Sequence, residues 1–101
     1  MKIIAVNISV NIQNGYGIKD SVKRAWKLKK KKTENYNYVI GVISGSIKGY
    51  FKREDTIIDA RHPDRIAFEL KEISANEKKA IRNYIAKNNI GLRYFVTKYI
   101  D

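Results

Sequence analysis

The residues best suited to binding a charged ligand lie in one short stretch of this chain. Positions 19–32 hold eight of the twenty-one lysines and arginines and a single carboxylate, Asp20, so this stretch carries +7 of the formal net charge of +11. Each Lys or Arg that neutralises a phosphate releases counterions from a nucleic acid, so a concentrated positive surface is typical of proteins that bind polyanions. The pattern predicts nucleic-acid binding and suits RNA and DNA equally. A solvated helix face without a ligand is the alternative interpretation of the same lysines.

Particular side chains in and near this stretch match the two parts of a nucleotide. The lysines predicted to contact phosphates are Lys19, Lys23, Lys27, Lys30 and Lys31. Arg24 and Arg65 suit a phosphate or a base edge, because a planar guanidinium can bind either one. Trp26 and Tyr50 are the predicted stacking side chains, since unpaired bases stack on aromatic rings while cations follow the phosphates. For Trp26, the alternative is a place in the hydrophobic core.

A second chemistry, metal-dependent cleavage of a phosphodiester, depends on Asp59, Glu69 and Lys71. An acid on one strand followed by Glu-x-Lys on the next presents carboxylates and a lysine on one face of a sheet. The alternative is that Glu69 and Lys71 form the solvent side of an antiparallel strand. The chain has no cysteine and one histidine, His62, and thus no ordinary zinc ligand set. It also contains no phosphate-binding loop and no nucleophile elbow.

We therefore expect non-catalytic nucleic-acid binding, with no catalytic residue, no metal and no cofactor. A protein-interaction or adaptor domain that binds an acidic partner or self-associates is the second hypothesis, and the metal-dependent nuclease is a distant third. The chain of 101 residues predicts a single domain over 1–101, long enough to bury a hydrophobic core. No apolar run approaches the length of a membrane span, and the first ten residues have no signal-peptide pattern, so a cytoplasmic protein is expected.

The elements that must position these residues follow from hydrophobic periodicity. The predicted strands are 2–12, 38–43, 47–51, 56–60, 65–73 and 92–100, and the predicted helices are 18–32 and 75–88. In the first strand, apolar residues alternate with small or polar residues from Ile4 onward, which indicates that one face of the strand is buried. Ser74 and Glu77 form a capping box that opens the second helix. The order β-α-β-β-β-β-α-β predicts the α+β class, with a small, curled, mostly antiparallel sheet that forms a partly closed barrel.

Two details of the predicted sheet concern packing. With Ser44-Gly45-Ser46 as the hairpin loop, Ile43 faces Ile47 and Gly41 faces Gly49. Two opposed glycines leave a notch in the sheet face, which a bend or another element can fill. Phe68 alternates with exposed residues on its strand and should be buried.

The segments Val22–Leu28, Tyr38–Lys52 and Arg65–Glu69 together resemble a family of uncharacterised small bacterial domains. Its members pair a helix bearing arginine, tryptophan and lysine with a glycine-containing hairpin, and Leu92-Arg93-Tyr94 is similar to the family's closing Ile-Arg-Tyr. The family is similar to PUA-like small β-barrels, many of which bind RNA or modified bases in DNA. Arg53-Glu54-Asp55 stands where the family has a tryptophan after the hairpin. The residues that carry over are Arg24, Trp26, Lys27, Arg65 and Phe68.

Overall fold

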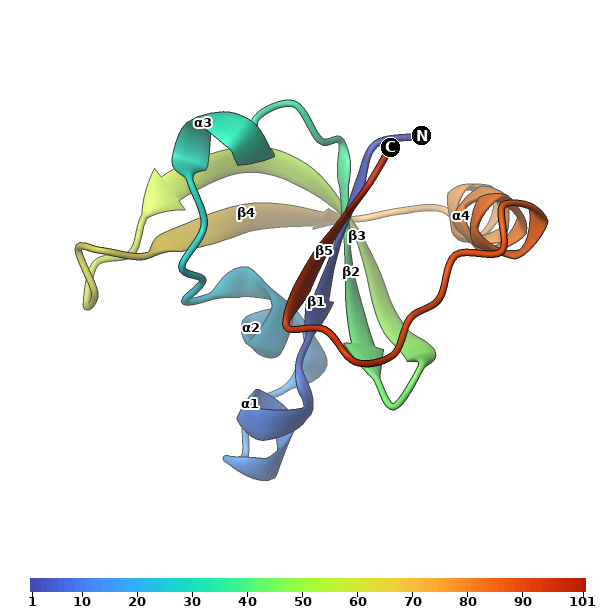
Figure 1. Ribbon diagram of the computed structural model, residues 1–101. Helices are drawn as coiled ribbons and strands as arrows, with labels where there is room; N and C mark the ends of the chain where they lie inside the picture. The colour runs from blue at the N-terminus through green and yellow to red at the C-terminus, as the bar shows by residue number, and fades with distance from the viewer.

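Five strands form one twisted sheet in a computed structural model that describes residues 1–101 (Figure 1). The strands are β1 (Ile3–Asn7), β2 (Tyr38–Ile43), β3 (Ser46–Ile58), β4 (Ile66–Glu72) and β5 (Thr97–Ile100). Their order in the sheet is β4-β3-β2-β1-β5; β1 and β2 are parallel, and the other neighbours are antiparallel. The predicted α+β class with a mostly antiparallel sheet is confirmed. The sheet is open and does not close into a barrel.

Helices cover both faces of this sheet (Figure 1). They are α1 (Ser9–Gln13), α2 (Ile18–Lys23), α3 (Lys30–Thr33) and α4 (Ala75–Lys87). On one face, Val22 of α2 packs into a core cluster with Phe68 of β4, which is fully buried as predicted. On the other face, Ile81 and Ile85 of α4 pack on Ile3 and three other residues of β1 and β2, together with Ile100. None of the helices is long and apolar enough to span a membrane.

The first strand departs from prediction in its length and its burial. It ends at Asn7, whose side-chain oxygen accepts a hydrogen bond from the backbone N–H of Ser9 at the start of α1. Ile8 and Ile12 are four residues apart, a spacing that fits an alternating strand and a helix equally. The prediction of one buried face is wrong because β1 lies between two strands and beneath helices on both sides, so Ile3–Val6 are all buried. Such a strand is apolar on both faces.

The predicted helix 18–32 is two short helices joined by an extended segment. α2 ends at Lys23, and Trp26 forms a bridge with Ile66 through backbone hydrogen bonds of 3.0 and 2.9 Å. In a continuing helix, the Val22 carbonyl would accept from the backbone N–H of Trp26. Here it accepts from the Trp26 indole N–H instead, at 2.8 Å. The amphipathic spacing of the side chains does not show that the backbone of Trp26 pairs with the first residue of β4.

The hairpin is confirmed with a shorter loop than predicted. Ser44 and Gly45 alone form the turn with positive φ angles, so Ile43 pairs with Ser46 and not with Ile47. Gly41 still faces Gly49, because a bulge after Gly41 absorbs the difference. The predicted strand 56–60 is the far end of β3, which makes five strands and not six. The last strand is shortened to Thr97–Ile100, and the capping box at the start of α4 is present.

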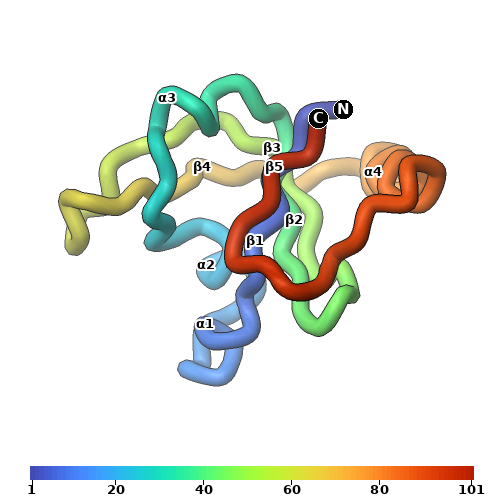
Figure 2. The backbone as a smooth tube through the Cα atoms, in the orientation of Figure 1, coloured from blue at the N-terminus to red at the C-terminus, as the bar shows by residue number.

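The notch between the two glycines is occupied by the helical layer. A Cβ atom at Gly41 would lie 2.5 Å from Val22 Cγ2, and one at Gly49 would lie 2.7 Å from Ile18 Cγ2. Both neighbours belong to α2, so the glycines let this helix approach the sheet closely. The two chain ends lie together on the opposite side of the sheet centre from this packing (Figure 2), where Lys2 Nζ pairs with Asp101 Oδ1 at 3.1 Å.

Candidate nucleic-acid interface

A pocket of about 350 Å³ lies where four parts of the chain meet. These parts are the end of β1 with α1, the segment around α2, the extended residues 24–27, and the turn that joins β3 to β4. The lining residues are Asn7, Val10, Asn11, Tyr16, Asp20, Arg24, Ala25, Trp26, Lys27, Arg61, His62 and Arg65. Three arginines and one lysine therefore face a pocket with a single lining carboxylate, which gives the pocket an excess of positive charge.

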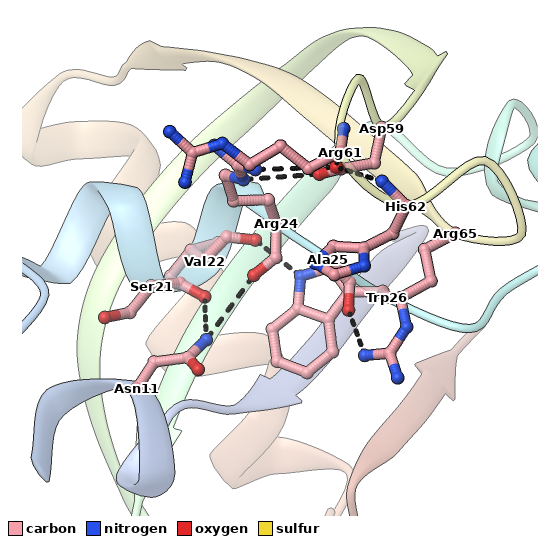
Figure 3. Close-up of polar contacts among 10 residues, drawn as sticks. All are labelled: Asn11, Ser21, Val22, Arg24, Ala25, Trp26, Asp59, Arg61, His62 and Arg65. Carbon is pink, nitrogen blue, oxygen red and sulfur yellow. Dashed lines mark hydrogen bonds and ion pairs between the residues drawn. The ribbon is translucent and has the colours of Figure 1, made fainter. Parts of the chain in front are cut away.

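Asp59 lies buried behind the pocket wall and holds two of its parts together (Figure 3). Its Oδ2 atom accepts from Arg24 Nε at 3.2 Å, and its Oδ1 atom accepts from Arg24 Nη2 at 3.4 Å. The same Oδ1 atom accepts from the backbone N–H groups of Arg61 at 2.8 Å and His62 at 3.1 Å. One carboxylate thus fixes the direction of the Arg24 side chain and the shape of the β3–β4 turn.

The ionisation of Asp59 follows from this environment. Burial raises the pKa of the carboxyl, but the backbone N–H groups of Arg61 and His62 and the charge of Arg24 outweigh it and hold the pKa below its usual value. Asp59 is therefore a carboxylate at neutral pH, and it compensates part of the Arg24 charge. The remaining basic residues of the pocket, Lys27, Arg61 and Arg65, form no ion pair.

Backbone contacts fix the segment that carries Arg24 and Lys27 (Figure 3). Asn11 Nδ2 donates to the carbonyl oxygens of Ser21 at 3.1 Å and of Arg24 at 3.4 Å. Arg65 Nη1 donates to the carbonyl oxygen of Ala25 at 3.3 Å. These contacts tie α1 and β4 to the end of α2, so the pocket wall is formed before a ligand arrives. A preformed wall lowers the entropic cost of binding.

The structure brings together four of the residues singled out from sequence: Arg24, Trp26, Lys27 and Arg65. Trp26 keeps only 8% of its surface exposed and belongs to the core cluster, so its indole lines the pocket by an edge. The alternative interpretation of Trp26, as a core residue with a bonded indole N–H, describes its position best.

The other predicted contacts lie elsewhere. Tyr50 packs on the opposite face of the sheet beside α4, with the Arg82 guanidinium 5.7 Å from its ring centre, so it does not join Trp26 in one site. Lys30 pairs with Glu34 at 3.1 Å. The predicted lysine surface is divided because the helix is divided: Lys19 and Lys23 belong to α2 outside the pocket, and Lys30 and Lys31 belong to α3.

Sequence reasoning missed several pocket residues. Tyr16 lies between Gly15 and Gly17, and 54% of its surface is exposed. An aromatic residue between two glycines could have indicated an exposed binding side chain. Arg61 and His62 belong to a turn that is basic at both ends, although His62 was interpreted as an ordinary turn histidine. Asn7 and Asn11 gave no signal, because they come from a segment that was predicted to be a strand.

The three residues considered for a nuclease do not lie together in the structure. Asp59 is buried and turned toward Arg24, whereas Glu69 and Lys71 are exposed on β4. Glu69 pairs with Asp55, which lies four residues before Asp59, or about 13 Å along the strand. No group of three or more potential metal-ligating side chains occurs in the structure.

Comparison with protein-family models, with curated proteins and with solved structures found no match for this chain.

Proposed function

We propose that this domain binds nucleic acid without catalysing a reaction, through the pocket between α2 and the β3–β4 turn. The observation that carries this proposal is that Arg24, Lys27, Arg61 and Arg65 line one concave site, although they come from two segments far apart in the chain. Guanidinium groups bind phosphate oxygens through two parallel hydrogen bonds, so three arginines in one site suit a phosphate-bearing ligand.

The lysines outside the pocket add to the positive charge that a nucleic acid would meet. Lys19 and Lys23 stand on α2 and Lys31 stands on α3, and none of the three forms an ion pair. Such lysines contribute to affinity by releasing counterions and carry no information about base sequence. RNA and DNA both fit this description, and the proposal assigns the domain to the cytoplasm.

The resemblance to PUA-like bacterial domains belongs to the same proposal. Four of the five residues on which the resemblance depends line one pocket: Arg24, Trp26, Lys27 and Arg65. The fifth, Phe68, lies in the core cluster to which Trp26 also belongs. A family whose shared residues build one site and the core beside it would use that site for its common function.

The experiment is a salt titration of binding to a random-sequence oligonucleotide. Log K should fall linearly with log salt concentration, with a slope of about −0.7 to −0.9 per neutralised phosphate. The double variant Lys27→Glu/Arg61→Glu should lose most of the affinity at moderate salt. The matched control is Lys79→Glu/Lys87→Glu, which makes the same charge change at exposed positions of α4, on the opposite face of the sheet.

The two variants separate a localised site from general attraction between opposite charges. The control should keep most of its affinity, because surface charges more than about 8–10 Å from the ligand are largely screened at physiological ionic strength. An equal loss in the two variants would contradict the proposal. So would a slope that is unchanged when the two pocket cations are reversed.

A further inference from the structure

The pocket has a shape that a general phosphate-binding surface does not need. Phosphates within a duplex lie on its convex outside, where exposed lysines on a flat or ridged surface reach them. This site is instead concave, and its volume of about 350 Å³ lies at the lower end of the range for pockets that enclose one small ligand. It can therefore enclose a single nucleotide unit and excludes a paired duplex.

The charge in the pocket exceeds what one internal phosphodiester requires. Asp59 compensates part of the Arg24 charge, and Asp20 is the one carboxylate in the lining. Lys27, Arg61 and Arg65 remain without an acidic partner. An internal phosphodiester carries one negative charge, whereas a terminal phosphate monoester carries between about 1.5 and 2 at neutral pH and offers three acceptor oxygens. The monoester matches this excess of cations better.

Tyr16 supplies the part of the pocket that a phosphate does not use. It lies in the lining between two glycines, and 54% of its surface is exposed although no hydrogen bond holds its hydroxyl. An exposed aromatic side chain beside a cationic pocket can stack on a base, and every base has a π-face for such a contact. The pocket thus offers cations for a phosphate and a ring for the base attached to it.

We infer that this pocket holds the phosphorylated end of an unpaired nucleic-acid strand. The terminal phosphate lies among Lys27, Arg61 and Arg65, and the terminal base stacks on Tyr16. This inference depends on the proposed function, because it names which part of the nucleic acid enters the pocket.

The test compares oligonucleotides of one sequence with an internal fluorescent label. They carry a 5′-phosphate, a 3′-phosphate or hydroxyl groups at both ends, and binding is followed by fluorescence anisotropy. One additional charge-assisted hydrogen bond corresponds to about ten- to a hundredfold in affinity, so one phosphorylated form should bind at least about tenfold more tightly than the hydroxyl form. Arg61→Ala should abolish this gain, whereas Lys79→Ala should keep it. The Arg61 backbone N–H that Asp59 accepts from is retained in the variant.

The role of Tyr16 has its own variants. Tyr16→Ala should weaken binding of the phosphorylated oligonucleotide, and Tyr16→Phe, which keeps the ring, should bind as the parent does. Circular dichroism of each variant confirms that the fold is retained.

The other possible results would contradict this inference alone or the proposed function as well. Equal affinity for all three oligonucleotides would overturn this inference and leave the proposed function intact. Failure of all three to bind would overturn both. If free nucleoside monophosphates bind and none of the oligonucleotides does, the site is one for a small phosphate monoester, and again both proposals are wrong.

Discussion

Replacing Gly41 by alanine tests the contact that brings α2, and with it Arg24, onto the sheet. A Cβ atom at this position would lie 2.5 Å from Val22 Cγ2 and 3.0 Å from Ile8 Cδ1. Carbon atoms in favourable contact are about 3.5–4.0 Å apart. Ile8 can withdraw the end of a flexible side chain, but Val22 is short, β-branched and fully buried, so α2 itself must shift.

Two opposing effects set the size of the loss. Overpacking of a core by one methyl group costs about 1–3 kcal/mol. Alanine in the interior of a strand is favoured over glycine by about 0.5–1 kcal/mol, because glycine loses more backbone freedom on folding. The free energy of unfolding of Gly41→Ala should therefore fall by about 1–2 kcal/mol. In a domain of this size, each 1 kcal/mol lowers Tm by about 4–8 °C.

The assay is urea unfolding followed by circular dichroism, with Gly91→Ala as the control. Gly91 has no atom within 4 Å of its Cβ direction and no positive φ, so this change should be neutral or stabilise by about 0.4–1 kcal/mol. The double variant Gly41→Ala/Val22→Ala should lose less than the sum of its single variants, because removal of Cγ2 makes room for the new methyl group. Additive losses, or a stable Gly41→Ala, would refute the close approach of α2.

Three further changes test the core, the wall of the pocket and a helix end. Phe68→Ala should lower the free energy of unfolding by about 3–5 kcal/mol in the same assay, since Phe68 is fully buried. Asp59→Asn should weaken oligonucleotide binding even though it removes a negative charge; tighter binding would show that charge alone matters. The pKa of Asp59 is lower in the folded protein than in the unfolded chain, where it is about 4. The stability that its carboxylate contributes is therefore complete above about pH 4 and is lost as the pH falls through the lowered pKa. A plot of Tm against pH in the acid range should show this loss in the parent and not in Asp59→Asn. Ser74→Ala should cost about 1 kcal/mol, because it removes the N-cap acceptor of the Glu77 N–H at 3.1 Å.

Local sequence patterns were sufficient to predict the hairpin, helix α4 and the buried face of β4. The capping box, the glycine-containing turn and the alternation around Phe68 are each complete within a few residues, and no distant part of the chain competes for the same backbone groups. The hairpin was therefore predicted correctly, but its loop was predicted one residue too long. The pairing of Gly41 with Gly49 is correct only because a bulge after Gly41 offsets that error.

The segment before the hairpin could not be predicted in this way. Its structure is decided by partners thirty-five to forty residues away: Trp26 bridges Ile66, and Arg24 pairs with Asp59. Hydrophobic periodicity predicts which side chains lie on one face of a helix or strand. It does not show where a helix ends when its next backbone groups form hydrogen bonds with a distant strand. The predicted helix 18–32 was therefore wrong, and Trp26, which was predicted to stack on a base, lies in the core as its alternative interpretation had it.

The pocket depends on the same distant pairings, and this explains why eight of its twelve lining residues were missed. Arg24 and Lys27 come from the segment after α2, whereas Arg61 and Arg65 come from the turn before β4. In sequence these are a lysine-rich run and an unremarkable basic turn, thirty-seven positions apart at Arg24 and Arg61. Buried Asp59 joins them because it binds the Arg24 guanidinium and the backbone N–H of Arg61, and the Trp26–Ile66 bridge holds the same two segments together. The positions of the pocket cations are thus set by contacts between residues far apart in sequence, and the exposed lysines of α2 and α3 that first attract attention lie outside the pocket.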